Sequence, residues 1–133
     1  YKLFVSNDIK LAFKFKADGI YVPSFNKTKK FLNLEKRNFI VLGSAHNQKE
    51  IQTKISQNCK AIFLSPLFYV KKSKTFLGLH KFNYLSFANK IKIFPLGGIT
   101  ENNIRKLKIT SIKGFGGIRI FKKKTGLFTG RFS

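Results

Sequence analysis

A pair of glycines, Gly97 and Gly98, follows an apolar run and comes just before Thr100. Thr100 can cap a helix that begins at Glu101. Because glycine has no side chain over the backbone N–H groups, an anion could approach them at the positive end of that helix. The pattern predicts a phosphate site, and Gly98→Val is expected to block it while the fold stays in place. The alternative is a tight turn that needs glycine only for its backbone angles.

Polar residues that could bind a metal or transfer a proton follow two other apolar runs. Asn7 and Asp8 come after the first run, and Ser44 and His46 come after the third. Asp8 is either the cap of the next helix or a ligand for a metal ion. His46 is either a structural hydrogen-bonding residue or a group with a chemical role. The residue types allow both interpretations in each case.

The longest loop in the chain, residues 69–78, carries three lysines, Lys71, Lys72 and Lys74. Long loops on a catalytic face are commonly lids or substrate clamps, and a lysine-rich loop could close over a pyrophosphate. The alternative is a charged loop in contact with solvent.

The elements that must position these residues follow from six apolar, β-branched or aromatic runs. The runs are residues 3–6, 19–22, 39–43, 61–67, 91–96 and 115–121. Runs that are apolar on both faces and separated by one helix's length predict βα units around a parallel sheet. Asn47 and Glu50 predict a capped helix, with Ile51 and Ile55 as its buried stripe. The candidate residues follow the strands, at the edge where such barrels hold their chemistry.

Length and composition indicate a single domain, residues 1–133, with 43% hydrophobic residues and a substantial core. No apolar run approaches the roughly 18 residues of a membrane-spanning helix, so no membrane partner is expected. The sequence has no Met, even at position 1, and we therefore expect an internal or truncated piece of a longer protein. The single Cys59 is expected to be a small buried apolar residue in a cytoplasmic protein.

The net charge of +22 would ordinarily indicate nucleic-acid binding. However, the lysines are scattered over all segments, and the chain is also rich in Asn, Ile and Phe, which A/T-rich codons encode together with Lys. The charge therefore has two interpretations, genome composition and a general attraction for phosphorylated small molecules. We expect no nucleic-acid partner, and phosphorylated small molecules as the ligands.

Taken together, these motifs form an ordered set that covers nearly the whole chain. The set is Asn7-Asp8, Ala17-Asp18-Gly19-Ile20, Gly43-Ser44-Ala45-His46, Ser65-Pro66-Leu67-Phe68, Gly78 and Leu96-Gly97-Gly98-Ile99. It resembles thiamine phosphate synthase and its relative, the TenI-type thiazole tautomerase. The resemblance implies an α/β fold, a (β/α)₈ TIM barrel truncated at the N-terminus, with about strands 3 to 8 present.

For the synthase, the resemblance implies a transferase that couples hydroxymethylpyrimidine diphosphate to thiazole phosphate and releases pyrophosphate, with Mg²⁺ on the leaving group. Asn7 would contact the pyrophosphate, and Asp8 would bind Mg²⁺. Ser44 would line the pyrimidine and pyrophosphate site, and Gly98 would bind the thiazole phosphate. Lys74 matches the family's pyrophosphate lysine when a one-residue insertion is allowed.

Two departures from the family pattern affect the expected activity. The family's second magnesium carboxylate has no counterpart here, because residues 23–26 contain no acid. Ser24, Asn26 and water would have to complete the magnesium shell. Arg119 replaces a small residue at the end of the eighth strand and is expected at the substrate site. Thiamine phosphate synthesis is the leading prediction. The alternatives are a TenI-type tautomerase, in which His46 would shuttle a proton, and a non-catalytic phosphate-binding relative.

Overall fold

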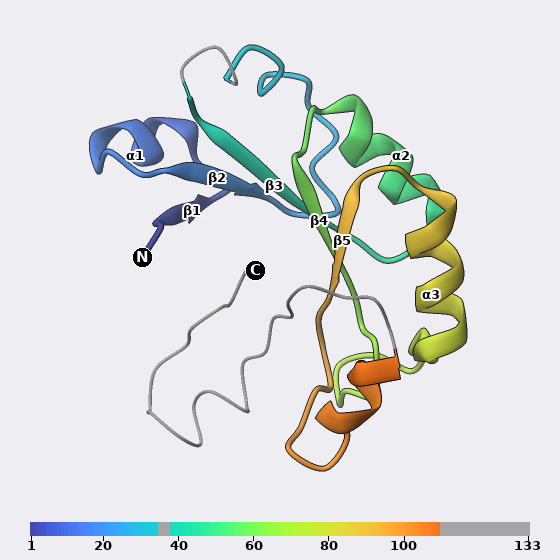
Figure 1. The fold of residues 1–133 in the computed structure, drawn as a ribbon. Helices are drawn as coiled ribbons and strands as arrows, with labels where there is room; N and C mark the ends of the chain where they lie inside the picture. The colour runs from blue at the N-terminus through green and yellow to red at the C-terminus, as the bar shows by residue number, and fades with distance from the viewer. Residues whose placement is uncertain (35–37, 110–133) are drawn as a thin grey trace. The chain divides into compact units, whose positions relative to one another are not determined.

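The computed structural model describes residues 1–34 and 38–109 (Figure 1), in which a helix follows each strand except the strand at residues 19–22, which is followed by the strand at residues 40–45. The elements are β1 (Phe4–Ser6), α1 (Ile9–Lys14), β2 (Gly19–Val22), β3 (Ile40–Ala45), α2 (Gln48–Ser56), β4 (Ala61–Leu64), α3 (Gly78–Ala88), β5 (Lys92–Pro95) and the 3₁₀ helix η2 (Ile104–Ile109). The strands form one sheet in the order β1-β2-β3-β4-β5. The predicted α/β class with a parallel sheet is confirmed. The strand expected at residues 115–121 lies outside the described residues.

The chain divides into two compact units, Tyr1–Ile62 and Phe63–Ser133. The first unit contains β1, α1, β2, β3 and α2, and the second contains α3, β5 and η2. The boundary falls within β4. The single domain expected over residues 1–133 stays a prediction.

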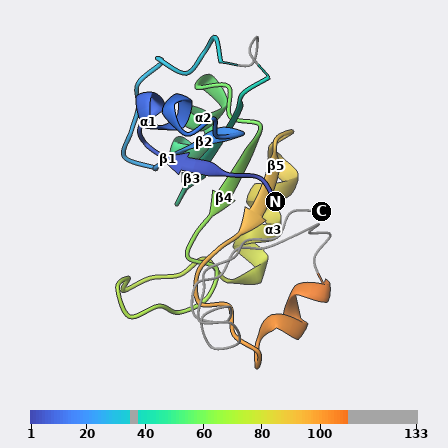
Figure 2. The same cartoon turned by 90° about the vertical axis from the view of Figure 1, so that its left-hand side faces the viewer.

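In the first unit, β1, β2 and β3 pair in parallel, and the register decides which side chains share a face. Tyr21 pairs with Leu42, so Ser44, two residues further along β3, lies on the same face as Tyr21. The opposite face includes Ile20 and Val41, which are 0% and 1% exposed. Figure 2 shows α1 and α2 on the same side of these strands. The helices therefore cover one face, and the polar side chains Tyr21 and Ser44 are on the other.

Both helices of the first unit begin at side-chain caps. Asn47 Oδ1 accepts a hydrogen bond from Glu50 N at 2.9 Å, and the Glu50 carboxylate accepts one from His46 N at 2.7 Å. This reciprocal arrangement confirms the predicted start of α2. Ile51 is fully buried as expected, but Ile55 is 37% exposed and Lys54 takes the second buried position. The expected stripe was therefore half wrong, because the helix turns Lys54 rather than Ile55 into the core.

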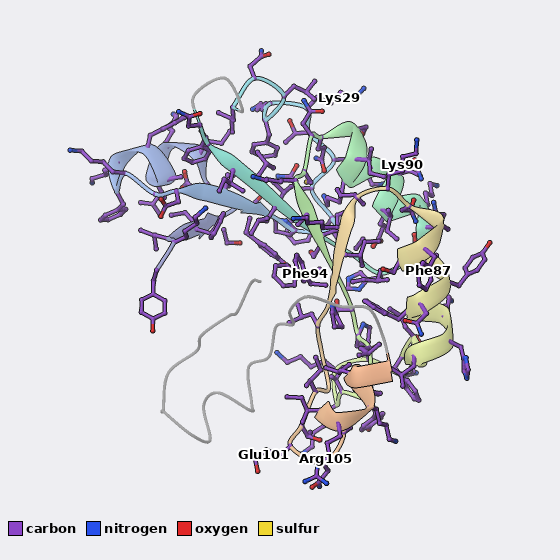
Figure 3. All side chains as sticks on the ribbon, viewed as in Figure 1. Lys29, Phe87, Lys90, Phe94, Glu101 and Arg105 are labelled. Atoms are coloured by element: carbon purple, nitrogen blue, oxygen red, sulfur yellow. The ribbon has the colours of Figure 1, made fainter. Side chains whose placement is uncertain are left out.

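The second unit packs aromatic side chains from β4, β5 and α3. The Phe94 ring, labelled in Figure 3, lies 5.9 Å from the ring of Phe63, centroid to centroid. Phe82 and Leu85 form the buried face of α3, while Phe87 on the same helix is exposed. Over the part of the chain that the structure describes, no helix is long and apolar enough to span a membrane.

We expect Asn47→Ala to lower the free energy of unfolding by about 0.5–2 kcal/mol, because it removes the oxygen that caps α2. Urea denaturation followed by circular dichroism measures the loss. Lys49→Ala, at an exposed position two residues further on, is the control and should change the free energy of unfolding by less than about 0.5 kcal/mol. Equal losses in the two variants would show that the cap does not stabilise the helix.

Candidate functional site

In the first unit, two asparagine side chains are joined where β1 and β2 end. Asn26 Nδ2 donates a hydrogen bond to Asn7 Oδ1 at 2.5 Å, and Asn26 Oδ1 accepts one from Thr28 N at 2.9 Å. The backbone N–H of Asn7 donates to Tyr21 O at 2.8 Å. Both amides are therefore fixed in orientation. Among the described residues nothing accepts from Asn7 Nδ2, so this donor is available to an anion.

Asp8 caps α1, as one of its two predicted interpretations required. Its Oδ1 accepts a hydrogen bond from Leu11 N at 2.9 Å, and the side chain is exposed. Nothing in the described ranges donates to the second oxygen, Oδ2. Within the same ranges there is no group of three or more His, Cys, Asp or Glu residues that could hold a metal ion. Asp8 is thus a confirmed cap with one carboxylate oxygen left for another ligand.

Tyr21 and Ser44 form a polar pair on the face of the strands opposite the helices. Their side chains are hydrogen-bonded, and Ser44 is only 8% exposed. Burial raises the pKa of the Tyr21 hydroxyl above its ordinary value, and the hydrogen bond with Ser44 partly offsets this rise. The sequence analysis predicted Ser44 but missed Tyr21. The pairing of Tyr21 with Leu42 was the signal, and it requires the strand register.

His46 follows Ala45, the last residue of β3, and its side chain is exposed. Its backbone N–H donates to the Glu50 carboxylate, which fixes the position of the residue.

A buried polar cluster from α2 lies under the loop that contains Asn26, and no sequence pattern indicated it. Lys54 Nζ donates to Asn26 O at 2.7 Å and to Gln57 Oε1 at 2.8 Å. Gln57 Nε2 donates to Asn26 O at 2.9 Å and to Thr28 O at 2.7 Å. Lys54 and Gln57 are both 0% exposed. The loop that places Asn26 is therefore held by two side chains of the neighbouring helix.

Burial also sets the ionisation of this cluster. It lowers the pKa of Lys54 below its ordinary value, an effect that nearby Cys59 and Glu50 partly offset. Burial raises the pKa of the Cys59 thiol to about 11, with Lys54 acting in the opposite direction. Cys59 is 7% exposed and stays protonated at neutral pH. It is therefore a buried apolar residue, as expected, and not a nucleophile.

In the second unit, the glycine pair forms a turn of unusual backbone conformation. Gly97 has φ 96° and Gly98 has φ 70°. Thr100 N donates to Asn103 Oδ1 at 2.8 Å, Asn103 N donates to Thr100 Oγ1 at 3.3 Å, and Asn103 Nδ2 donates to Gly98 O at 2.8 Å. In the described part of the chain, the N–H groups of Gly97, Gly98 and Ile99 have no acceptor. Three consecutive free donors are a suitable arrangement for a phosphate.

The lysine-rich loop begins and ends beside this turn. At its base, Leu77 N donates to Pro66 O and Gly78 N donates to Leu67 O, both at 2.9 Å. Phe68 N donates to Gly97 O at 3.1 Å, which ties the base to the glycine turn. Both ends of the loop are therefore held by hydrogen bonds beside the candidate phosphate site.

The tip of this loop carries the positive charge. Ser73 N donates to Val70 O at 3.2 Å, which closes a turn around Lys71 and Lys72. These lysines and Lys74 are exposed, so their ammonium groups remain hydrated and available to an anion. After the glycine turn in the sequence, Glu101 and Arg105 are exposed and point outward (Figure 3).

The structure corrects one expectation about Gly98. A Cβ at this position would lie 2.6 Å from the carbonyl oxygens of Phe68 and Tyr69. Such a distance is far below van der Waals contact, and φ 70° is itself unfavourable for other residues. Gly98→Val would therefore disturb the fold as well as the site. The turn therefore needs the conformation of glycine, as the alternative interpretation required, and the phosphate site stays a prediction.

Comparison of the chain with protein families gives a match over most of its length. The sequence model of thiamine monophosphate synthase matches residues 1–121. The chain belongs to this family. The predicted resemblance is thereby confirmed.

Individual members of the thiamine monophosphate synthase family match at modest identity. The thiamine-phosphate synthase of Prochlorococcus marinus strain SARG is 30% identical over 118 residues, which are 84% of this chain and 33% of that protein. That of strain AS9601 is 32% identical over 118 residues, with the same coverage. The chain thus spans about a third of the length of these curated relatives.

A solved structure shares the fold. Thiamine phosphate pyrophosphorylase from Pyrococcus furiosus superposes with a TM-score of 0.71 at 19% identity, covering 86% of this chain and 55% of that one. The prediction that this chain is part of a (β/α)₈ barrel agrees with the likeness.

The predicted family site residues fall in both units. The first unit contains Asn7, Asp8, Ser44 and His46, all at or after strand ends. The second unit contains Lys74, Gly97 and Gly98. Arg119 lies outside the described residues. The structure joins Asn7 to Asn26, which was expected only as a member of the magnesium shell, and Ser44 to Tyr21, which the sequence did not indicate.

We expect Gly98→Ala to lower the free energy of unfolding more than Gly78→Ala does. Both glycines have positive φ, 70° and 74°, but a Cβ at Gly78 meets nothing within 4 Å. The backbone term of about 1–2 kcal/mol is common to both, and only Gly98→Ala adds a collision worth roughly 1–3 kcal/mol. Urea denaturation of the two variants compares them directly. Equal losses would mean that the loop carbonyls move aside freely.

Proposed function

We propose that the protein is a thiamine phosphate synthase-like transferase, which couples hydroxymethylpyrimidine diphosphate to thiazole phosphate and releases pyrophosphate. Family membership and the names of its relatives support this proposal. The observation that carries it is the free donors in each unit. Asn7 Nδ2 in the first unit and the N–H groups of Gly97 and Gly98 in the second have no acceptor among the described residues, and each suits a phosphate oxygen.

In the first unit the chain's own residues would bind and orient the pyrimidine diphosphate. Asn7 would donate from Nδ2 to a diphosphate oxygen, because its Oδ1 is already engaged by Asn26. Ser44, hydrogen-bonded to Tyr21, would line the pyrimidine end. A pyrophosphate leaves with a large negative charge, so fixed donors that stabilise the charge as it develops account for much of the rate.

A magnesium ion is compatible with this site only when the substrate brings part of its shell. The described residues contain no cluster of three metal-ligating side chains, and Asn26 Oδ1 is occupied by Thr28 N. The chain offers Asp8 Oδ2, and Mg²⁺ commonly binds one or two carboxylates together with substrate phosphates and water. When bound, Mg²⁺ would neutralise charge on the leaving pyrophosphate.

In the second unit, the glycine turn would bind the thiazole phosphate. The N–H groups of Gly97, Gly98 and Ile99 would donate to its oxygens. The nearby loop lysines, Lys74 among them, would supply positive charge to the phosphorylated substrates. Arg119 is proposed as a further substrate-binding residue. We place this activity in the cytoplasm, since the one cysteine is a free buried thiol.

A TenI-type thiazole tautomerase is the second candidate. It is favoured by the absence of an acid in residues 23–26 and by the engagement of both polar ends of the Asn26 amide. A tautomerase moves a proton and needs no metal. The exposed His46 at the end of β3 would then be the general acid and base.

Substitutions at Asp8 and His46 distinguish the two reactions. If the protein is a synthase, Asp8→Ala and EDTA should each abolish most thiamine phosphate formation, and His46→Ala should be tolerated. A tautomerase should keep its rate in Asp8→Ala and in EDTA, and lose about 10²- to 10⁴-fold in rate with His46→Ala. Product formation from both substrate sets, followed by mass spectrometry, measures the rates.

Two matched controls accompany this experiment. Asp8→Asn keeps a good helix cap but removes the charge, so a synthase should lose activity in this variant without losing stability. His80→Ala removes an exposed histidine from α3 and should leave either activity unchanged. Thiamine phosphate formation that persists in EDTA and in Asp8→Ala would contradict the synthase proposal.

A further inference from the structure

We propose that Lys54 and Gln57 are positioning residues for the diphosphate site, and that they act through Asn26 on Asn7. The inference rests on the proposed function, because it concerns the same site in the first unit. Neither residue would touch the substrate. Both would fix the loop that carries Asn26. The Asn26 side chain in turn orients the Asn7 amide, which would contact the substrate.

The contacts form a continuous chain from the buried helix to the free donor. The ammonium of Lys54 and the amide nitrogen of Gln57 converge on one carbonyl oxygen, that of Asn26, at 2.7 and 2.9 Å. The Asn26 side chain then donates to Asn7 Oδ1. With Oδ1 occupied, the Asn7 amide can present only its NH₂ group outward. Loss of the hydrogen bonds from Lys54 and Gln57 would therefore leave the Asn7 amide without a fixed orientation.

A second hydrogen bond from Gln57 holds the same loop at another carbonyl oxygen. Gln57 Nε2 also donates to Thr28 O at 2.7 Å, and Thr28 N donates to Asn26 Oδ1 at 2.9 Å. The loop is therefore fixed at two carbonyls, and the Asn26 side chain is fixed at both of its polar ends. Because both polar ends are held, the Asn26 amide has one orientation. A single hydrogen bond would not fix it.

Burying the Lys54 ammonium costs free energy, which indicates that this group has a role beyond filling space. In the described part of the chain, Lys54 makes no ion pair, and neutral oxygens of Asn26 and Gln57 take its hydrogen bonds. Desolvation of an ammonium costs several kcal/mol, whereas an apolar residue of the same length would fill the space without that cost. A positive charge beneath the Asn7–Asn26 pair also favours an anion there over a metal cation. Position and charge both suit a diphosphate.

The test is calorimetric titration of the protein with inorganic diphosphate. Lys54→Met keeps the length of the side chain but removes the charge and the donor, and we expect it to weaken diphosphate binding roughly tenfold or more, since small displacements of a binding group are costly. Lys49→Met removes an exposed positive charge from the same helix and should change the affinity less than twofold. A general loss of charge attraction would weaken both variants alike and would overturn the positioning role.

A double-mutant cycle tests the route through Asn26. Asn26→Ala alone should weaken diphosphate binding to a similar extent, and adding Lys54→Met to it should cost little more, because both changes break one chain of contacts. Additive losses would overturn the proposal. If Lys54→Met does not fold, Asn26→Ala, at a partly exposed turn, decides alone: unchanged affinity in that variant would overturn the proposal.

A merely structural role is separated by a second readout. Inorganic phosphate binding at Gly97 and Gly98, followed by their backbone amide NMR signals, should be unchanged in Lys54→Met, and a parallel loss there would overturn the proposal. Absence of diphosphate binding by the unsubstituted protein would overturn the proposed function and this inference with it. Equal diphosphate affinity of the unsubstituted protein and Lys54→Met would overturn the positioning role alone.

Discussion

One side-chain hydrogen bond, from Asn26 Nδ2 to Asn7 Oδ1, links the ends of β1 and β2 and orients the free donor of the first unit. It depends on a loop whose carbonyl oxygen at Asn26 is held by Lys54 and Gln57 from α2. That helix in turn begins at the Asn47 cap. Asparagine here orients a donor by hydrogen bonding, whereas a carboxylate would offer a second metal ligand. The site is thus better suited to contacting phosphate oxygens directly than to holding a metal through protein ligands.

In the second unit, close backbone packing rather than a side-chain hydrogen bond leaves donors free. The glycine turn must pass close to the carbonyls of Phe68 and Tyr69, and only a residue without Cβ fits there. The positive φ angles of Gly97 and Gly98 then leave consecutive N–H groups unused by the sheet. The close backbone packing and the free N–H groups are therefore consequences of one conformation. Substitutions that test binding at this turn will also change stability.

Local sequence patterns predicted the elements, and long-range packing supplied the partners of the site. The strand runs, the Asn47 cap and the positions of Asp8 and Gly98 were readable because they depend on neighbours within a few residues. The place of Tyr21 at the site and the hydrogen bond from Asn26 to Asn7 became visible only through strand register and loop contacts that join distant segments. The error at Ile55 has the same origin, since Lys54 is buried by a loop 28 residues earlier in the chain. Charge alone did not mark Lys54, because a helical lysine is usually exposed.

We propose that each unit binds a phosphate group through donors that the fold leaves free. A crystal structure of the protein grown with inorganic diphosphate and phosphate tests it most directly. The account predicts diphosphate against Asn7 Nδ2 and phosphate against the N–H groups of Gly97, Gly98 and Ile99. Empty density at both places with millimolar anions present, or anions bound only to surface lysines, would contradict it.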